Sequence, residues 1–398
     1  MYISKKITLY ITCSLLIILL ASCQSIPPVK EAHTYLEFNE AIRQLSNDLM
    51  TKLPQSFSRD VATIILNPFI DIDSGQILQV SRDIERRFSD EIRKYFKQFN
   101  ISRIALANLS NAQYVLNGFI KYEASKTHNK KKYYQISASI VDLTTRIIVA
   151  KATVLTVSEK LNYQPIPSYE DNPLYNFKSA TLKLILDIYK GKIGTKISEN
   201  YYKFITTKAL LVDAQTAYDK NNYQQAHNFY TQALQMPSGK IMETYGGLYM
   251  TNFKLGNLKE AAKNFYNMIR ISVQNGSFPV KLLFQTDSTD FLEVKELRQQ
   301  YMLWLKQISL YMKTHPSLCI DIIGHTSKYG LDQFNQRLSE RRANMIQQKM
   351  RKYFPKITKT STTTGMGSQQ TIVGTVPDNI DNAIDRRVEF RIVKCSST

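Results

Sequence analysis

A short loop near the end of the chain constrains the fold more than any other stretch. Leu318–Ile323 has the pattern of a strand, and residues 331–354 show the periodicity of a helix. Between them lies Gly-His-Thr-Ser-Lys-Tyr-Gly, from Gly324 to Gly330. The sequence therefore predicts a binding loop that leads from a strand directly into a helix.

The segments around this loop predict an α/β sandwich with its helices on one side of a sheet. Val280–Phe284 is a short strand, and Phe291–Met312 is a helix that ends before Pro316. A Gly/Thr-rich section reaches Gly365, and residues 386–393 form a final alternating strand. The expected order is strand, helix, strand, helix, strand and a closing strand.

The helix after the loop carries one charged residue that needs a partner. Apolar side chains form a ridge along this helix: Phe334, Leu338, Ile346, Met350 and Phe354. Arg342 interrupts the ridge with a permanent charge, which is costly there unless an acidic group pairs with it. The acid is either a ligand carboxylate held in bidentate fashion or an internal one, namely Asp321, Asp332 or Asp385.

Several motifs occur together in this region. They are Gly324-His325-Thr326, Gly330, Asn335, Leu338-Ser339, Arg342-Ala343, Gly365-Met366-Gly367 and Arg386-Arg387-Val388. On these motifs, residues 277–398 resemble the OmpA-like peptidoglycan-binding domain, a βαβαββ sandwich. The resemblance implies that Arg342 holds the carboxylate of diaminopimelate in the peptide stem of peptidoglycan. The implied binding residues are Thr326, Ser327, Asn335, Leu338, Arg342, Arg386 and Arg387.

Ser327 departs from the family pattern. Family members have an Asp at this position, which holds the ammonium group of the diaminopimelate, whereas a hydroxyl supplies no charge. The loss should cost about 1–3 kcal/mol, or roughly tenfold to a hundredfold in affinity. Binding could persist weakly through Arg342, Asn335 and backbone groups, Asp332 could act as a substitute acid, or the domain could have become a protein-binding or structural module.

His325 is not expected to be catalytic, because no nucleophile or paired carboxylate accompanies it in the motif and the family uses this residue structurally. Elsewhere the sequence contains no nucleophile–base set, phosphate-binding loop or metal-ligand cluster. An enzyme is therefore the weakest interpretation, and no cofactor is expected.

The resemblance also implies a disulfide. In the family, the last strand lies between the first and the second and runs antiparallel to both, so the start of the second strand faces the end of the last. Cys319 and Cys395 occupy these two positions. A bond between them would close a long loop and stabilise the fold by roughly 4 kcal/mol in the chain-entropy model.

The start of the chain predicts export and a lipid anchor. Lys5 and Lys6 precede Ile7–Leu20, an apolar run with the length of a signal-peptide core and short for a membrane span. The run ends in Leu20-Ala21-Ser22-Cys23, which resembles a bacterial lipobox whose cysteine receives acyl chains such as palmitate. An ordinary cleavable signal peptide or an uncleaved helical anchor is the alternative. Gln24 favours the outer membrane, because an Asp there commonly means inner-membrane retention.

The remaining cysteines and the charge fit an exported protein. Cys13 leaves with the signal peptide, so Cys319 and Cys395 remain in an oxidising compartment. The formal net charge is +19. Such a basic chain could bind nucleic acid, but an exported lipoprotein rarely meets any, so anionic envelope polymers and lipid headgroups are the expected counter-charges.

Residues 35–200 predict an α/β domain. Helices are expected at 35–53 and 77–96, and strands at 61–66, 113–124, 133–143 and 147–157, the last three as a meander. The runs Tyr114–Gly118 and Val141–Thr145 resemble the periplasmic domains of the LpoB, FlgO and CsgG lipoprotein group, although Arg146 stands where that group often has glycine. That group binds envelope proteins. A generic α/β domain is the alternative.

Residues 201–275 resemble a pair of tetratricopeptide repeats. Ala226 and Ala261 are 35 residues apart, close to the period of about 34 in such repeats. Two repeats form a short solenoid, so flanking helices at 201–211 and before Gly191 are expected to cap it. Repeats of this type bind peptides or proteins on a concave face, and an unrelated pair of helical hairpins is the alternative.

The predicted organisation is a signal peptide (1–22), a lipidated tether (23–34), the α/β domain (35–200), the repeats (201–275) and the OmpA-like domain (277–398). The expected function is that of an outer-membrane lipoprotein facing the periplasm, which tethers to peptidoglycan and scaffolds envelope proteins. A regulator that activates a peptidoglycan-synthesising enzyme through its α/β domain is the second hypothesis.

Overall fold

The computed structural model describes residues 35–55, 61–123, 132–158, 161–164, 166–173, 180–275, 278–371 and 380–395. The predicted signal peptide, the lipobox with Cys23 and the tether lie outside these ranges. In the part of the chain that is described, no helix combines the length and the apolar character needed to cross a membrane.

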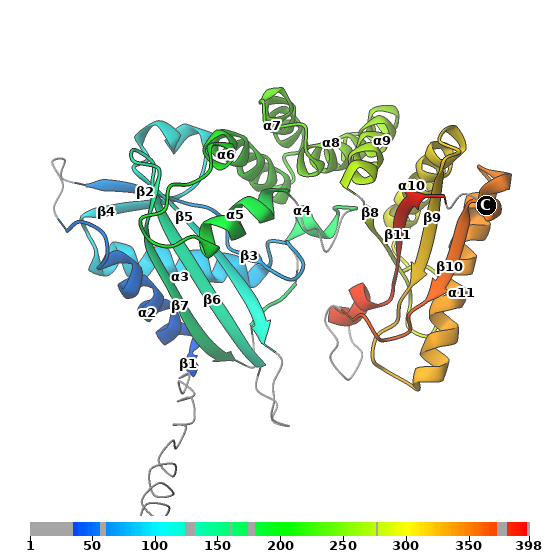
Figure 1. Ribbon diagram of the computed structural model, residues 1–398, viewed down its shortest axis with the longest axis horizontal. Helices are drawn as coiled ribbons and strands as arrows, with labels where there is room; N and C mark the ends of the chain where they lie inside the picture. The colour runs from blue at the N-terminus through cyan, green and yellow to red at the C-terminus, as the bar shows by residue number, and fades with distance from the viewer. Residues whose placement is uncertain are drawn as a thin grey trace, which may run out of the picture. The chain divides into compact units, whose positions relative to one another are not determined.

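The first part of the chain folds around a mixed sheet with the strand order β1-β7-β6-β5-β2-β4, and β3 pairs with β5 (Figure 1). The strands are β1 (Tyr35–Glu37), β2 (Ala62–Leu66), β3 (Ile70–Asp71), β4 (Phe99–Arg103), β5 (Tyr114–Glu123), β6 (Lys132–Asp142) and β7 (Ile147–Ser158). The meander of β5, β6 and β7 is antiparallel, as predicted. The strands β1, β3 and β4 were not predicted, and the helix expected from residue 35 begins only after β1.

Two layers of helices bury the two faces of this sheet. The helices are α2 (Phe38–Met50), α3 (Gln79–Tyr95), α5 (Ala180–Lys190) and a 3-10 turn, η2 (Leu106–Asn111). Ile64 packs in the core beneath α2 and α3, whereas Ile65 packs in the opposite core with α5. This alternation follows from the two-residue period of a strand. β5 continues through Gly118, and the missing side chain makes room for the ring of Phe69, which would lie only 2.2 Å from a Cβ there.

The middle of the chain is helical, with α6 (Glu199–Asp219), α7 (Tyr223–Gln235), α8 (Met242–Lys254) and α9 (Leu258–Asn275) each packed against the next. Ala226 and Ala261 are fully buried. Tyr230 packs so closely on α8 that a Cβ at Gly247 would meet its ring at 2.2 Å. The predicted flanking helix at 201–211 is part of α6, which is the first of these four helices and no separate cap.

The last part of the chain has the order β8 (Phe278–Leu283), α10 (Lys295–Thr314), β9 (Leu318–Gly324), α11 (Asp332–Arg351), β10 (Ser361–Gly365) and β11 (Arg387–Lys394), with the 3-10 turns η3 (Pro355–Lys359) and η4 (Ile380–Asp385). The sheet order is β10-β9-β11-β8, and β11 runs antiparallel to β8 and β9. The predicted βαβαββ sandwich is therefore confirmed. A disulfide joins Cys319 to Cys395, with a Cα–Cα distance of 4.9 Å.

The helical region shares hydrophobic cores with both of its neighbours. Tyr201 of α6 belongs to the core on the α5 side of the first sheet. At the other end, Phe265 of α9 stacks on Trp304 of α10 with ring centroids 5.8 Å apart. The indole Nε1 of Trp304 donates to the hydroxyl of Tyr249, on α8, at 2.6 Å. Residues 35–398 accordingly form one compact unit.

Candidate functional site

The candidate site lies where β9 ends and α11 begins, and two glycines bring these elements into backbone contact. A Cβ at Gly324 would stand 1.9 Å from the carbonyl oxygen of Ser339, and one at Gly365 would stand 2.6 Å from the amide nitrogen of Glu340. Because the backbones are this close, Oγ of Ser339 accepts a hydrogen bond from the amide of Gly367 at 2.9 Å. Side chains on the first half of α11 are thereby held over the ends of β9 and β10.

We expect Gly324→Ala to destabilise the chain by about 3 kcal/mol, because the added methyl group collides with backbone that cannot rotate away. Gly330→Ala is the matched control, since Gly330 has φ of +90° and open space around its Cα, so the cost is limited to about 1–2 kcal/mol of backbone strain. Urea unfolding followed by the fluorescence of Trp304, the single tryptophan, measures both. Equal losses in the two variants would contradict the steric explanation.

Arg342 lies at the centre of the site and is fully buried. Its Nε donates to the carbonyl of Ser288 at 2.9 Å, and its two terminal nitrogens donate to the carbonyls of His325 at 2.9 Å and Gln285 at 2.8 Å. The guanidinium also lies 5.1 Å from the ring centroid of Phe284. Backbone carbonyls from the segment after β8 and from the loop after β9 thus surround the charge, and Arg342 joins these two segments to α11.

The surroundings of Arg342 differ from those expected. Leu338, Ile346 and Met350 of the apolar ridge are buried, but Phe334 is 40% exposed, so the buried ridge begins one turn later. Asp321, one of the three internal acids considered, accepts from Nε of Arg391 at 2.9 Å and from Thr362 Oγ1 at 2.6 Å. Asp332 is exposed in the first turn of α11. Asp385 is fully buried.

The loop that follows β9 is also buried in its first half. The amide of Thr326 donates to the carbonyl of Gly367 at 2.9 Å. Thr326 is 2% exposed, and among the described residues its Oγ1 has no hydrogen-bond partner. Ser327 is 5% exposed. Asn335, buried on α11, donates its side-chain amide to the carbonyl of Tyr329 at 2.9 Å and fixes the second half of the loop.

His325 has a structural position. Its amide donates to the carbonyl of Arg387 at 2.8 Å, which ties the loop to the start of β11. Nε2 lies 3.2 Å from Oε1 of Glu389. Burial lowers the pKa of His325, although Glu389 opposes this effect. The ring is therefore neutral at neutral pH and fills space beneath the loop.

The two arginines before and at the start of β11 are directed inwards. Arg386 is 6% exposed, and its Nε donates to the carbonyl of Phe284 at 3.2 Å. Arg387 is 3% exposed and bonds to Glu389 Oε2 at 3.3 Å and to the carbonyl of Gln370 at 3.1 Å. Both residues lie beside the predicted site, and their hydrogen bonds build its frame.

The residues expected at this site lie in one region of the structure. Their charged side chains, those of Arg342, Arg386 and Arg387, are buried. What the sequence did not indicate is the exposed apolar surface next to them, formed by Tyr329 (50% exposed), Leu331 (79%) and Phe334 (40%). The sequence also did not indicate that main-chain carbonyl groups surround Arg342. Every residue has such a group, so no residue type marks their position. Within the described ranges, no group of three or more His, Cys, Asp or Glu side chains could hold a metal ion.

Comparison with known proteins defines the class of this domain. Residues 284–384 match the model of the OmpA family. The C-terminal part of the chain is therefore an OmpA-family domain, as its fold and motifs predicted.

Individual relatives share only parts of the chain. A stretch of 42 residues is 45% identical to outer membrane porin F of Pseudomonas aeruginosa and covers 11% of this chain and 12% of the porin. The crystal structure of the peptidoglycan-associated lipoprotein from Burkholderia pseudomallei is 20% identical and aligns with 28% of this chain and 89% of that one, with a TM-score of 0.24. An outer membrane protein from Borrelia burgdorferi is 27% identical over 29% of this chain and 84% of its own, with a TM-score of 0.22.

Proposed function

We propose that this protein is an outer-membrane lipoprotein that holds peptidoglycan through its C-terminal domain and scaffolds envelope proteins with its other parts. The observation that carries the proposal is the OmpA-family domain at residues 284–384, whose motifs include Thr326, Ser327, Asn335 and Arg342. The lipobox-like sequence ending at Cys23 supports the lipid anchor, and Gln24 supports the outer membrane.

The geometry refines how such a site would hold a peptide stem. Because Arg342 has no exposed surface, a direct grip on a ligand carboxylate requires the Gln285 or Ser288 segment to move. The hydroxyl of Thr326 is also buried, so a ligand reaches it only after the loop shifts, but it has no partner to lose among the described residues. An unsatisfied buried hydroxyl costs about 1–3 kcal/mol, so a ligand that bonds to it recovers that energy. We infer that Thr326 makes the first contact, with the charge of Arg342 acting from beneath.

Two variants of the chain from residue 24 onward test this site in a sedimentation assay with purified peptidoglycan. Thr326→Val should leave folding stability unchanged or raise it by about 1 kcal/mol, because an unpaired hydroxyl is removed, while sedimentation weakens roughly fivefold. Ser327→Asp should strengthen sedimentation roughly tenfold by restoring an acid for the ligand ammonium. The whole chain is required, because an isolated 277–398 fragment would expose Trp304 and its neighbours.

Equal sedimentation of wild type and both variants would contradict the roles given to Thr326 and Ser327, and wall binding itself would be contradicted if none of them sedimented. Wild type that stays in solution while Ser327→Asp sediments would show a site that has lapsed through this one position. Circular dichroism of each variant should accompany the assay, since Ser327 is buried and an added carboxylate there needs a partner.

One observation favours a second function, that of a protein-binding module. Tyr329, Leu331 and Phe334 expose apolar surface beside the site, and clustered exposed apolar side chains commonly mark contacts with other macromolecules. With Ser327 in place of the family acid, the domain could hold a protein in place of the wall. The lapsed-site result described above would support this second function.

A further inference from the structure

A short segment between the first sheet and the helices lies across two of the helices. We call residues 166–173 the strap; it contains the short helix α4 (Pro167–Glu170). The amide of Ser168 donates to Oδ1 of Asp219, on α6, at 2.9 Å. The hydroxyl of Tyr218, also on α6, donates to Oδ2 of Asp171 at 2.7 Å, and Nζ of Lys254, on α8, lies 3.3 Å from the same oxygen. The strap therefore contacts the first and third helices of the group.

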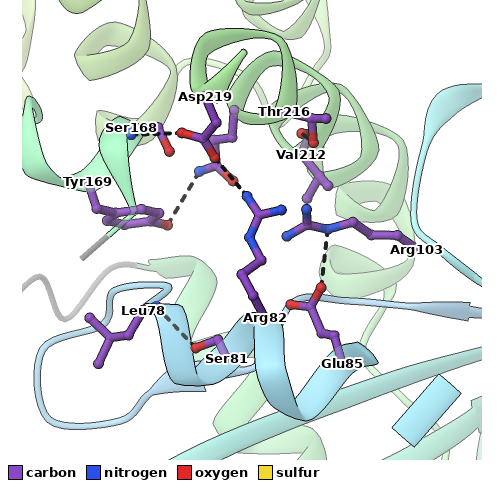
Figure 2. A network of polar contacts seen from close by, with 11 residues as sticks. Leu78, Ser81, Arg82, Glu85, Arg103, Ser168, Tyr169, Val212, Thr216 and Asp219 are labelled. Atoms are coloured by element: carbon purple, nitrogen blue, oxygen red, sulfur yellow. Dashed lines mark hydrogen bonds and ion pairs between the residues drawn. The ribbon is translucent and has the colours of Figure 1, made fainter. Parts of the chain in front are cut away.

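Side chains of the strap enter this contact. Ile166 and Ser168 are each 2% exposed. The ring of Tyr169 extends towards α6, where Gln215 donates to its hydroxyl at 3.4 Å (Figure 2). The strap thus presents an aromatic ring and, two residues later, the carboxylate of Asp171 to the same face.

The helix α8 presents a glycine as well as Lys254 to the strap. A Cβ at Gly246 on α8 would lie 3.4 Å from the side-chain oxygen of Asn172, an ordinary van der Waals contact. Asn172 therefore lies close to this part of α8. Larger side chains at this position would press against the strap.

Charged groups on the helices are already oriented for this segment. Oδ2 of Asp219 pairs with Arg82 of α3 at 2.7 Å, which leaves Oδ1 aimed at the amide of Ser168 (Figure 2). Lys254 is held between Asp171 and Glu296, at 3.3 and 2.7 Å. The face therefore offers one acceptor for a backbone amide and two donors, from Tyr218 and Lys254, for a carboxylate.

We propose that the face formed by α6 and α8 is a binding site for a short acidic peptide, and that the strap, with its helical turn α4, is its built-in occupant. The partner segment would carry an aromatic residue two positions before a carboxylate, the spacing of Tyr169 and Asp171. This inference deepens the scaffolding role proposed above and rests on it. The pair between Lys254 and Asp171 is partly exposed, with side-chain exposures of 19% and 31%, so water and a competing carboxylate can reach it.

The strap competes with any free peptide for the face formed by α6 and α8, because it is tethered beside that face as an intramolecular ligand. Tethered segments act at effective concentrations in the millimolar range, so a free peptide of equal chemistry binds weakly until the strap's own anchors are removed. An opened chain with Tyr169→Ala and Asp171→Ala should therefore bind the free strap sequence, Ile-Pro-Ser-Tyr-Glu-Asp-Asn-Pro, at least tenfold more tightly than wild type. Fluorescence anisotropy of the labelled peptide with the chain from residue 24 onward measures the difference.

Matched controls separate specific from general binding. Adding Lys254→Ala to the opened chain should weaken peptide binding about tenfold, whereas adding Lys263→Ala should leave it unchanged, because Lys263 is an exposed lysine of α9 that pairs with Glu260. A peptide with alanine in place of its aspartate should also bind about tenfold less tightly. A folded opened chain that shows no binding, or that binds a scrambled peptide equally, would overturn the proposal.

A second measurement applies if the opened chain does not fold. In wild type, the amide of Ser168 bonds to Asp219 and the amide of Lys281 bonds to the carbonyl of Pro173 at 3.0 Å. Millimolar free peptide that displaces the strap should accelerate hydrogen exchange at both amides, and unchanged exchange would overturn the proposal. Peptidoglycan sedimentation reports separately on the C-terminal domain, so a failure of one proposal is distinguishable from a failure of the other.

Discussion

Replacing Arg342 with alanine is expected to destabilise the C-terminal domain by about 3–5 kcal/mol, because breaking a buried charged network leaves its remaining members unpaired. The carbonyls of Gln285, Ser288 and His325 each accept a hydrogen bond from this guanidinium. Once the side chain is removed, these carbonyls stay buried and lose their charged donor. The segment after β8 and the loop after β9 then lose their common link to α11.

The neighbouring residue provides the control for this prediction. Arg341 is exposed, and Arg341→Ala should change stability by less than about 0.5 kcal/mol. Urea unfolding followed by Trp304 fluorescence compares the two variants at equal net charge. Similar midpoints for both would show that the hydrogen bonds of Arg342 contribute little.

This prediction changes how a loss of wall binding in Arg342→Ala would be interpreted. Such a loss would report on a collapsed loop and could not by itself demonstrate a direct contact with the ligand. Thr326→Val is the better probe of contact, because it keeps the volume of the side chain and removes only the hydroxyl. Arg342 should therefore be tested for stability, and Thr326 for binding.

Replacing both Cys319 and Cys395 with serine is expected to cost about 4 kcal/mol, since the bond closes a loop with a sequence separation of 76 residues and restricts the unfolded chain. It ties the start of β9 to the residue that follows β11, where Val393 pairs with Cys319 across the sheet. The double variant should unfold at a clearly lower urea concentration than the oxidised protein.

Reduced wild type is the control for the substitutions, because it removes the bond and keeps both sulfur atoms. It should unfold close to the double variant. Non-reducing peptide mapping must first show the linked peptide in the starting material. Equal midpoints for oxidised and reduced protein would contradict the expected stabilisation.

The topology of the C-terminal domain was predictable from the sequence, because its helices and strands have strong periodic patterns and glycines mark its turns. The strand before Gly324 and the helix after Gly330 were recognisable for this reason. The bounds of β10 within the Gly/Thr-rich section were not recognisable, because Ser361–Gly365 is an edge strand of hydroxyl-bearing residues without apolar alternation. β4 was missed for a different reason: Phe99–Arg103 does alternate apolar and polar residues, but the run is only five residues long.

The residues of the candidate site were predictable from the sequence, but the hydrogen bonds between them were not. The motifs located Thr326, Asn335 and Arg342, but three of the groups that Arg342 bonds to are main-chain oxygens, which no sequence pattern marks. No sequence pattern marks the contacts of residues 166–173 with α6 and α8, because these contacts depend on tertiary packing. Hydrophobic cores also extend across the predicted domain boundaries near residues 200 and 277. α6 shares a core with the first sheet, and α9 shares one with the C-terminal domain.

The strand β1 has a mechanical consequence for a chain held at both ends. β1 pairs in parallel with β7 through Tyr35, Leu36 and Glu37, and Oγ1 of Thr156 adds a bond to the carbonyl of Leu36 at 2.9 Å. Tension applied to the residues before Tyr35 and directed along β1 loads these pairs together in shear, rather than peeling them apart in turn. With the lipid anchor proposed above, the first described element to bear force is thus a three-residue strand at the edge of the sheet.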